Sequence, residues 1–342
     1  MKDELFEEYS KEKEPTKYYK TYAWKTAIGL QKVDGLEPSE YLIKTAEQSI
    51  NGDISFDDAH KLITSYYKEN KTKSERTEEA DKVSVRIAQI ISEKSFVFSP
   101  VELTTIHKRL FEGVYSHAGR IRDYNISKEE WVLDGDTVIY GNAYNLKETL
   151  DYDLNLEKNF DYKGLSTEEA IKHLARFVAN LWQIHIFGEG NTRTTAVFLI
   201  KYLSKLGFNV TNDIFVENSW YFRNALVRAN YNNREKNINE TTYYLELFLR
   251  NLLLGEDNVL SNREMHIAYK DVEEKSKTIN DREKLILELI RDNPQITLTE
   301  ISQKIGKSLR TVNNTIKIMQ EKGIVERVGS KKNGTWKVLK GE

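Results

Sequence analysis

The sequence predicts a mainly α-helical protein. Its 342 residues include only four prolines, and leucine-rich stretches with apolar residues three or four positions apart run through most of the chain. Short turns rich in Gly, Asp and Asn divide these stretches into pieces of helix length. The chain is long enough for two or three domains, and 39% hydrophobic residues are enough to build a sizeable core.

The composition excludes several kinds of protein. The chain has no cysteine, which rules out a disulfide framework, thiolate zinc sites, cysteine nucleophiles and cysteine-bound iron–sulfur clusters. The longest apolar runs, such as 196–200 and 252–254, are too short to span a membrane, and the first eight residues lack the apolar stretch of a signal peptide. We therefore expect a cytoplasmic protein with no membrane partner.

Composition shifts and helix-stop sequences divide the chain into four expected parts. They are an N-terminal helical segment at residues 1–79, a central region at 80–255, a linker at 256–280 and a C-terminal module at 281–342.

The N-terminal segment is predicted to be a short series of helices. Its first helical pattern breaks at residues 34–39, where Ser39 is a favourable N-cap for the next helix, and residues 51–53 form the next stop. A further helix begins at Ser55, with acidic residues in its first turn where the helix dipole favours them. The polar stretch 68–79 marks the end of this segment.

The central region is predicted to be helical apart from one β element. Two amphipathic helices lie between residues 80 and 113, and two β-prone runs around an Asp-Gly pair predict a β-hairpin at 131–140. Ser166 begins a capped helix that continues to about residue 183. Further helices are expected at 192–206, 218–231 and 240–254.

The loop between two of these helices, residues 185–193, combines residues suited to anion binding. Gly188 and Gly190 let the backbone approach a ligand closely. The helix that begins near Asn191 presents free N–H groups, and Arg193 adds a positive charge one turn further on.

Two further side chains of this loop suit phosphate chemistry. Glu189 lies where a carboxylate can hold Mg²⁺ against bound phosphates, and His185 has a pKa suited to accepting a hydroxyl proton near neutral pH. A single histidine next to Phe187 is more often a packed core residue, but five functional residue types within nine positions are a specific combination. The pattern predicts a phosphate-binding loop with a metal ligand and a base, for phosphoryl or nucleotidyl transfer.

The loop resembles the signature of the Fic family, H-x-F-x-(D/E)-G-N-x-R-x-x-R, at every fixed position but the last. Residues 117–122, followed by the 131–140 hairpin, look like the segment and flap that precede this signature. Residues 221–230 are similar to the helix that borders the family's nucleotide pocket. The resemblance spans residues 80–255 and implies a Fic-type helical bundle with a β-hairpin flap.

The resemblance implies a protein adenylyltransferase, which transfers AMP from Mg-ATP to a Ser, Thr or Tyr hydroxyl of a protein. His185 would deprotonate the hydroxyl, Glu189 would position Mg²⁺, and Arg193 would neutralise the leaving diphosphate. A target protein would dock on the 131–140 flap by adding a strand to it. The ATP-binding residues implied are Gly188, Glu189, Gly190, Asn191, Thr192, Arg193, Tyr221 and Asn230.

The sequence departs from the family pattern in one important place. Ala196 stands where the signature has its second arginine, which in the family contacts the terminal phosphate and pairs with an inhibitory glutamate. Residues 28–63 resemble the small antitoxin that carries this glutamate in the motif (S/T)-x-x-x-E-(G/N), and Asp34 is its positional counterpart. A literal motif match also occurs at residues 65–70. We take Asp34 as the inhibitory residue; the alternative is that residues 1–79 form only a packing layer.

The C-terminal module predicts a winged helix-turn-helix domain, because three short helices are followed by β-prone segments at 324–328 and 335–339. It contains 13 Lys and Arg against 8 Asp and Glu, a net charge of +5, which leaves −7 on the rest of the chain. Lys331 and Lys332 would lie at the tip of the wing. The residues expected to contact DNA lie on the third helix: Ser308, Arg310, Thr311, Asn313, Asn314 and Lys317. Such modules also serve as dimer or inter-domain contacts.

Two functions follow from this combination. The first is a Fic-type adenylyltransferase with a fused antitoxin-like segment, with transfer of another nucleotide or removal of AMP as variants. The second is a DNA-binding transcriptional regulator whose degenerate Fic core only senses a nucleotide. The sequence does not decide the target protein, the DNA site or whether the chain forms a homo-oligomer.

Overall fold

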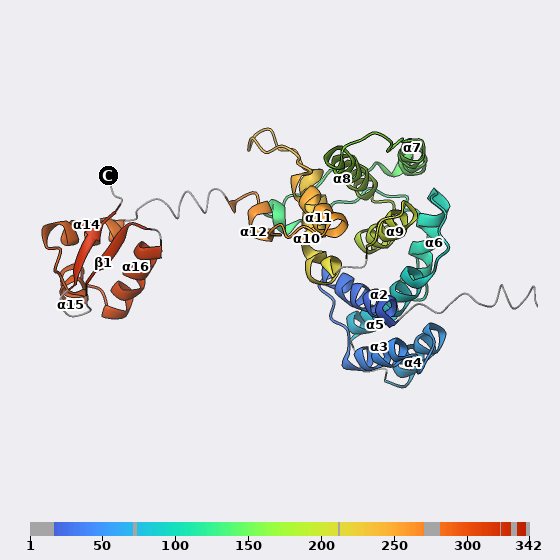
Figure 1. The fold of residues 1–342 in the computed structure, drawn as a ribbon, viewed down its shortest axis with the longest axis horizontal. Coiled ribbons are helices and arrows are strands. Elements are labelled where there is room, and N and C mark those ends of the chain that lie inside the picture. Colours follow the sequence, from blue (N-terminus) through green and yellow to red (C-terminus); the bar gives the residue numbers. More distant parts are fainter. Residues whose placement is uncertain are drawn as a thin grey trace, which may run out of the picture. The chain divides into compact units, whose positions relative to one another are not determined.

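The computed structural model describes residues 17–70, 74–210, 213–269, 281–321, 323–329 and 334–339. Its contacts divide the chain into two compact units, residues 1–267 and 268–342, and each is described by itself (Figure 1). In the described residues of the first unit the elements are α2 (Lys17–Gly29), η1 (Leu30–Asp34), α3 (Glu40–Asn51), α4 (Phe56–Glu69), α5 (Glu75–Ser92), α6 (Pro100–Phe111), η2 (Trp131–Leu133), η3 (Ala143–Asn145), α7 (Leu146–Lys158), α8 (Thr167–Ile184), α9 (Asn191–Lys205), α10 (Ile214–Ala229), α11 (Tyr243–Leu254) and α12 (Asn262–Met265).

Helix α9 lies at the centre of the first unit. Nearly every one of its residues is buried, and it packs against α5, α6, α8 and η1. A helix that is covered on all sides has no solvent-facing stripe, so the polar side chains it carries must find partners inside the protein. This burial is why the first turn of α9 can place charged and polar groups in a fixed geometry.

The N-terminal segment packs directly onto the central helices. Helix α2 lies along α5 and α10, and α3 and α4 pack together with α4 against α5 (Figure 1). Buried residues from Tyr22 to Met265 form one continuous apolar core. The residues before 80 therefore share their core with the central region, and η1 is held against α9 and α10.

Local sequence patterns explain the helix ends. The side chain of Ser39 caps α3, as predicted, and those of Ser55 and Ser166 form capping boxes at the starts of α4 and α8. Gly52 closes α3 in the left-handed conformation that glycine adopts most readily.

The β-hairpin predicted at 131–140 is wrong. Its segment begins with the single 3-10 turn η2 and contains no paired strand. The Asp-Gly pair does make a turn, since Asp134 and Gly135 have φ of 56° and 85°. However, the consecutive residues Val132 and Leu133 are both fully buried. A strand directs successive side chains to opposite faces, so burial of both neighbours in one core favours the compact turn instead.

The second unit has the predicted winged helix-turn-helix form. It contains α14 (Asp281–Asp292), α15 (Leu298–Ile305) and α16 (Leu309–Glu321), followed by β1 (Val325–Val328) and β2 (Thr335–Val338). The two strands pair antiparallel, with Val325 opposite Val338. A separate small core packs around Trp336, whose indole N–H donates to the Ile296 carbonyl. Lys331 and Lys332, expected at the tip of the wing, lie outside the described residues.

None of the helices in the described residues is both long and apolar enough to cross a membrane.

The close approach of α2 to α10 yields a first prediction. A Cβ added at Gly29 would lie 2.5 Å from the Cα of Val216. Replacing a helical glycine by alanine normally stabilises a helix by up to about 1 kcal/mol. Here we expect Gly29→Ala to destabilise the protein by about 1–3 kcal/mol, because the new methyl group meets backbone that cannot move aside. Urea unfolding measures the change; Glu47→Ala, at an exposed position of α3, is the control, and a stabilised Gly29→Ala protein would contradict the prediction.

Candidate active site

The loop between α8 and α9 is closed by its own side chains. His185 ends α8 with a φ of 50°, and Gly190 precedes α9 with a φ of 76°. Asn191 then ties the loop together: its side-chain carbonyl accepts from the Phe187 N–H at 3.0 Å, and its amide donates to the Phe187 carbonyl at 2.7 Å. The Asn191 side chain therefore shapes the loop from within and is not directed at a ligand.

The two loop glycines lie close to surrounding side chains. A Cβ at Gly190 would lie 2.4 Å from the ring of Phe111, and one at Gly188 would lie 2.6 Å from the hydroxyl of Tyr124. From the sequence, these glycines were expected to let a ligand approach the backbone. At Gly190, the positive φ and the packing against the buried ring of Phe111 already demand glycine, whereas at Gly188 the exposed Tyr124 side chain could move aside.

His185 is almost fully buried and its ring is enclosed by aromatic side chains. The ring centre lies 4.3 Å from that of Tyr140 and 5.3 Å from that of Trp182. Its backbone carbonyl accepts from Nε of Arg122 at 2.7 Å, which holds the residue in place. Nδ1 of the ring is buried and has no hydrogen-bond partner among the described residues. A buried, unpartnered ring nitrogen in an otherwise packed core suits a group that receives a proton from a ligand.

The surroundings of His185 keep its imidazole neutral. Burial lowers the pKa of His185 well below its usual value, and the positive charges of Lys128 and Arg223 lower it further. A base must be deprotonated to act. The direction of this shift therefore keeps His185 in its basic form at neutral pH and in mildly acidic solution.

A second histidine, His107, was not predicted from the sequence and contacts the 185–193 loop through Phe187 and Glu189. The ring of His107 stacks on Phe187 with 3.7 Å between centres, and its Nδ1 accepts from the Gly119 N–H at 2.8 Å. Its Nε2 must then carry the proton and donate to the Glu189 carbonyl, 3.0 Å away. Burial lowers the pKa of His107 to about 4, in keeping with the neutral ring that this pattern needs.

Glu189 directs its carboxylate outward. More than half of the side chain is exposed, and one carboxylate oxygen lies 2.9 Å from Nζ of Lys128. Within the described residues no three His, Asp or Glu side chains gather as a metal cage. A single reachable carboxylate fits Mg²⁺ that is shared with substrate phosphates, because this ion keeps several waters and takes few protein ligands. Lys128 neutralises this carboxylate in the structure.

Arg193 is the most heavily engaged residue of the loop. Its guanidinium is 1% exposed and stacks over the ring of Phe111. Its Nε lies 2.8 Å from a carboxylate oxygen of Asp34, an ion pair without hydrogen-bond geometry. The two terminal nitrogens donate to Gln31, Glu79 and Tyr115 at 3.0, 2.6 and 3.0 Å.

These partners also fix the charge of the guanidinium. Burial alone lowers the pKa of Arg193, but Asp34, the Tyr115 phenol and Glu79 outweigh it and raise the pKa. The four partners come from η1, α5 and the loop after α6. The N-terminal segment therefore occupies the positive group that the sequence argument assigned to the leaving diphosphate.

Asp34 also approaches a second arginine. Its other carboxylate oxygen lies 3.5 Å from a terminal nitrogen of Arg223 on α10. Arg223 in turn donates to both carboxylate oxygens of the buried Glu130, at 3.0 and 2.9 Å. Glu69, from the alternative motif at residues 65–70, lies at the end of α4, whereas Asp34 is, with Glu79, one of two carboxylates placed against Arg193.

The remaining predicted ATP-binding residues make structural contacts. The Thr192 hydroxyl accepts from the Trp182 indole at 3.0 Å. Tyr221 is buried, with its hydroxyl donating to the Tyr244 carbonyl, and the amide of Asn230 donates to the carbonyls of Ala179 and Leu226. None of these hydrogen bonds of Tyr221 and Asn230 reaches the 185–193 loop.

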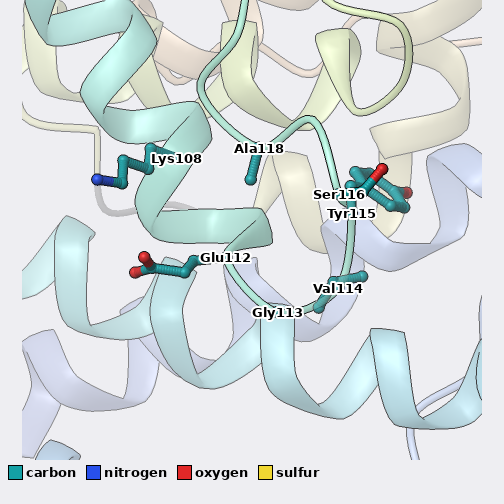
Figure 2. A pocket seen from close by; sticks show the side chains of 7 residues that line it. All are labelled: Lys108, Glu112, Gly113, Val114, Tyr115, Ser116 and Ala118. Carbon is teal, nitrogen blue, oxygen red and sulfur yellow. The ribbon is translucent and has the colours of Figure 1, made fainter.

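A pocket of about 470 Å³ lies at the end of α6 (Figure 2). Lys108 and Glu112 of the α6 end border it, and the loop from Gly113 to Ala118 curves round it. Tyr115 belongs both to this pocket and to the partners of Arg193. A second pocket, of about 440 Å³, lies between α4, α5 and α6. Neither pocket is lined by residues of the 185–193 loop.

The predicted DNA-contacting residues lie on or just before α16, the third helix of the second unit. Ser308 precedes the helix and its hydroxyl accepts from the Thr311 N–H at 3.2 Å, so Ser308 serves as a cap. Arg310, Asn313, Asn314 and Lys317 are exposed along the helix. They thus form a polar face that a nucleic acid could reach.

Comparisons with known proteins match both units. Residues 97–203 match the Fic/DOC family, and residues 279–326 match the winged helix-turn-helix DNA-binding family. A stretch of 60 residues, 16% of this chain, is 38% identical to the HTH-type transcriptional regulator LrpA of Pyrococcus horikoshii and covers 43% of it. The match thus spans less than half the length of that relative.

Two solved structures are similar over much of the chain. A Fic family protein from Desulfovibrio desulfuricans G20 has a TM-score of 0.43 and 11% identity, with 94% of this chain and 88% of that chain covered. The N-terminal FIC domain of Bep8, a VirB-translocated effector protein from Bartonella sp. 1-1C, has a TM-score of 0.33 and 18% identity, with coverage of 58% and 85%.

The internal closure of the loop yields a second prediction. Asn191→Ala removes both bonds to Phe187 and leaves a buried N–H and a buried carbonyl without partners, so we expect a loss of about 2 kcal/mol or more of unfolding free energy. Asn191→Asp keeps the acceptor but sets a buried carboxylate oxygen against the Phe187 carbonyl in place of the donor, so it should lose at least as much. Asn125→Ala is the control, because it removes a single bond from the exposed Asn125 side chain to the backbone of Ala143. Equal losses from Asn191→Ala and Asn125→Ala in urea unfolding would overturn this account.

Proposed function

Residues 97–203 are a Fic/DOC domain and residues 279–326 a winged helix-turn-helix domain, and from this premise we propose that the protein is an adenylyltransferase held inactive by its own N-terminal segment. The observation that carries the proposal is the ion pair between Arg193 and Asp34. It joins the arginine proposed to contact phosphate to the residue predicted from the sequence to be inhibitory.

His185 is the proposed base. A hydroxyl of the target protein attacks the α-phosphorus of ATP, the bond from that phosphorus to the bridging oxygen breaks, and diphosphate leaves. The hydroxyl proton passes to the imidazole. The buried, neutral ring of His185 suits this transfer, because its lowered pKa keeps it free of a proton before the reaction.

Charge compensation is the other task of the site. Arg193 and the N–H groups at the start of α9 would stabilise the charge of the diphosphate leaving group. Glu189 would hold Mg²⁺, which would neutralise phosphate charge when it binds with the nucleotide. For this, the Glu189 carboxylate must first release Lys128, 2.9 Å away in the structure.

The target protein is proposed to dock on residues 131–140. Ile139 is 85% exposed while its neighbours Val138 and Tyr140 are buried. Side chains at the end of this segment therefore alternate between the core and solvent. The same alternation is found in strands to which a further strand is added. The ring of Tyr140 contacts His185, so residues 131–140 lie next to the proposed base, which supports this docking site.

We expect loss of the Asp34 carboxylate to activate the enzyme. Asp34→Ala removes one of the four partners of Arg193. If the Asp34 ion pair favours the inhibited state by about 1.4 kcal/mol, its removal raises the transfer activity about tenfold. Intact mass spectrometry after incubation with Mg-ATP and a bacterial lysate measures adenylyl groups added to this chain and to lysate proteins.

Three variants make this measurement decisive. Asp34→Asn removes the charge and keeps the shape, so it should also activate, whereas Asp53→Ala, an exposed carboxylate of the same segment, should not. Asp34→Ala/His185→Ala should show no transfer although it folds. If Asp34→Ala transfers no nucleotide from ATP, GTP, CTP or UTP while remaining folded, the proposed activity is wrong.

We further propose that the second unit binds DNA. Its net charge of +5 and the exposed polar face of α16 support this role. If the nucleotide-sensing alternative holds, DNA binding would respond to nucleotide while His185→Ala left the output unchanged.

DNA binding should depend on salt and on the α16 face. We expect Arg310→Ala to weaken binding of a random duplex and to reduce the slope of log affinity against log salt by about one. Fluorescence anisotropy at several salt concentrations measures both quantities. Arg282→Ala on α14 is the charge-matched control. If the two variants bind equally, α16 is not the DNA-contacting helix.

A further inference from the structure

The cavity of about 440 Å³ between α4, α5 and α6 is lined almost entirely by polar side chains. Two arginines, two carboxylates, a histidine and a glutamine border it, together with the aliphatic side chain of Ile90. Its volume is typical of small-molecule sites. The cavity lies where the N-terminal segment meets the central helices, and none of its lining residues belongs to the 185–193 loop.

Some of these charged side chains already have partners. The guanidinium of Arg109 forks to the two carboxylate oxygens of Glu93, at 2.7 and 2.5 Å. Asp57 on α4 accepts from the side-chain amide of Gln89 at 3.2 Å. The charges that remain at the cavity belong to Arg86 and Glu112.

Arg86 on α5 carries a positive charge without a carboxylate beside it. Its Nη1 donates to the Leu110 carbonyl at 2.9 Å, and its Nε donates to Nε2 of His60 at 3.4 Å. His60 accepts as a neutral ring, in keeping with burial and the Arg86 charge, which both lower its pKa. Within the described residues no carboxylate forms an ion pair with Arg86. A guanidinium has more N–H groups than these contacts use, and one on each terminal nitrogen stays available for a carboxylate fork.

Glu112 carries the opposite charge and is likewise unpaired. It follows α6 directly, is exposed, and borders both this cavity and the one drawn in Figure 2. Its carboxylate makes no ion pair or hydrogen bond with any residue that the structure describes. Burial lowers the pKa of Arg86 and the charge of Glu112 raises it, so the two groups are near each other although they do not meet.

Two opposite charges held apart at one cavity match a ligand that carries both. A phosphate ion would meet Arg86 but would be repelled by Glu112 and Asp57, and a simple amine would be repelled by Arg86. A zwitterion satisfies both groups at once. In an α-amino acid the two charges are a few bonds apart, and the side chain can pack against Ile90.

We propose that the cavity between α4, α5 and α6 binds a free α-amino acid, with its carboxylate on Arg86 and its ammonium group on Glu112. The site is separate from the one to which the transfer reaction is assigned. The bound amino acid contacts α4, α5 and the end of α6, so its binding energy strengthens the attachment of the N-terminal segment to the central helices.

Isothermal titration calorimetry on the full chain tests this site. Each of the protein amino acids is titrated at millimolar concentration, and we expect at least one to bind. The amino acid that binds best is then compared with its N-acetyl derivative, which lacks the ammonium charge, and with its amide, which lacks the carboxylate. Each derivative should bind about tenfold more weakly or worse, because it loses one charge-assisted contact.

Two variants assign the two charges to their residues. Glu112→Gln should weaken binding about tenfold and remove the preference for the free amino acid over its N-acetyl derivative. Arg86→Gln should instead remove the preference over the amide, and Arg86→Lys, which keeps the charge but loses the fork, should lie between Arg86→Gln and the unchanged protein. Glu47→Gln, at an exposed position of α3, is the control. Thermal unfolding shows that each variant folds, and the exposed position of Glu112 keeps that test available if Arg86→Gln does not.

The outcomes decide the inference without any transfer reaction. It is overturned if no amino acid binds, if the N-acetyl derivative or the amide binds as tightly as the free amino acid, or if inorganic phosphate binds more tightly than any amino acid. It is also overturned if Glu112→Gln keeps the preference of the unchanged protein. Since none of these measurements involves ATP, the amino-acid site and the proposed adenylyltransferase activity stand or fall separately.

Discussion

The buried charge of Arg193 is the constraint on which the rest of the first unit depends. A guanidinium with 1% exposure cannot be left unpaired, because an uncompensated buried charge costs several kcal/mol. Helix α9 therefore requires acceptors around its first turn. They are supplied by η1, by Glu79 on α5 and by Tyr115 after α6, so one side chain draws three otherwise separate elements together.

This constraint gives the N-terminal segment a double role. Gly29 and Ser219 bring α2 and α10 into contact, with the Ser219 hydroxyl donating to the Gly29 carbonyl at 2.7 Å, and η1 follows directly into the space beside Arg193. Under the proposed function, the same carboxylate that completes the pairing of a buried charge also blocks access to it. The proposal thereby couples stability to inhibition: a ligand that displaced Asp34 would itself have to carry negative charge, since only an anion can replace what the carboxylate provides.

Sequence patterns predicted the features that depend on neighbouring residues. Ser39, Ser55 and Ser166 were identified as helix starts because a cap acts within three residues, and the winged helix followed from helix stops and two β-prone runs. The 131–140 hairpin failed because burial of Val132 and Leu133 overrides β propensity, a tertiary effect that no local pattern contains.

The missed site residues share a different cause. His107 meets Glu189 across 82 positions of sequence, and Arg223 meets Asp34 across 189. Neither pairing has a spacing that could reveal it, and only the packing of α6 and α10 around the loop brings them together. Asp34 was found because the resemblance to an inhibitory segment located it, whereas its actual partners could be seen only in the fold.

The burial of α9 also limits where positive charge can be placed. Arg193 already uses the acceptors available around the first turn, and Ala196 lies one turn further into the core with no exposed surface. A second arginine there would need its own set of buried carboxylates, at a cost that the first turn has already shown to be large. Helix α10 avoids this cost, because Arg223 is partly exposed and Glu130 already pairs with it. A second positive charge is therefore easier to accommodate on α10 than at position 196 of α9. Arg223 of α10 lies on the opposite side of the Asp34 carboxylate from Arg193.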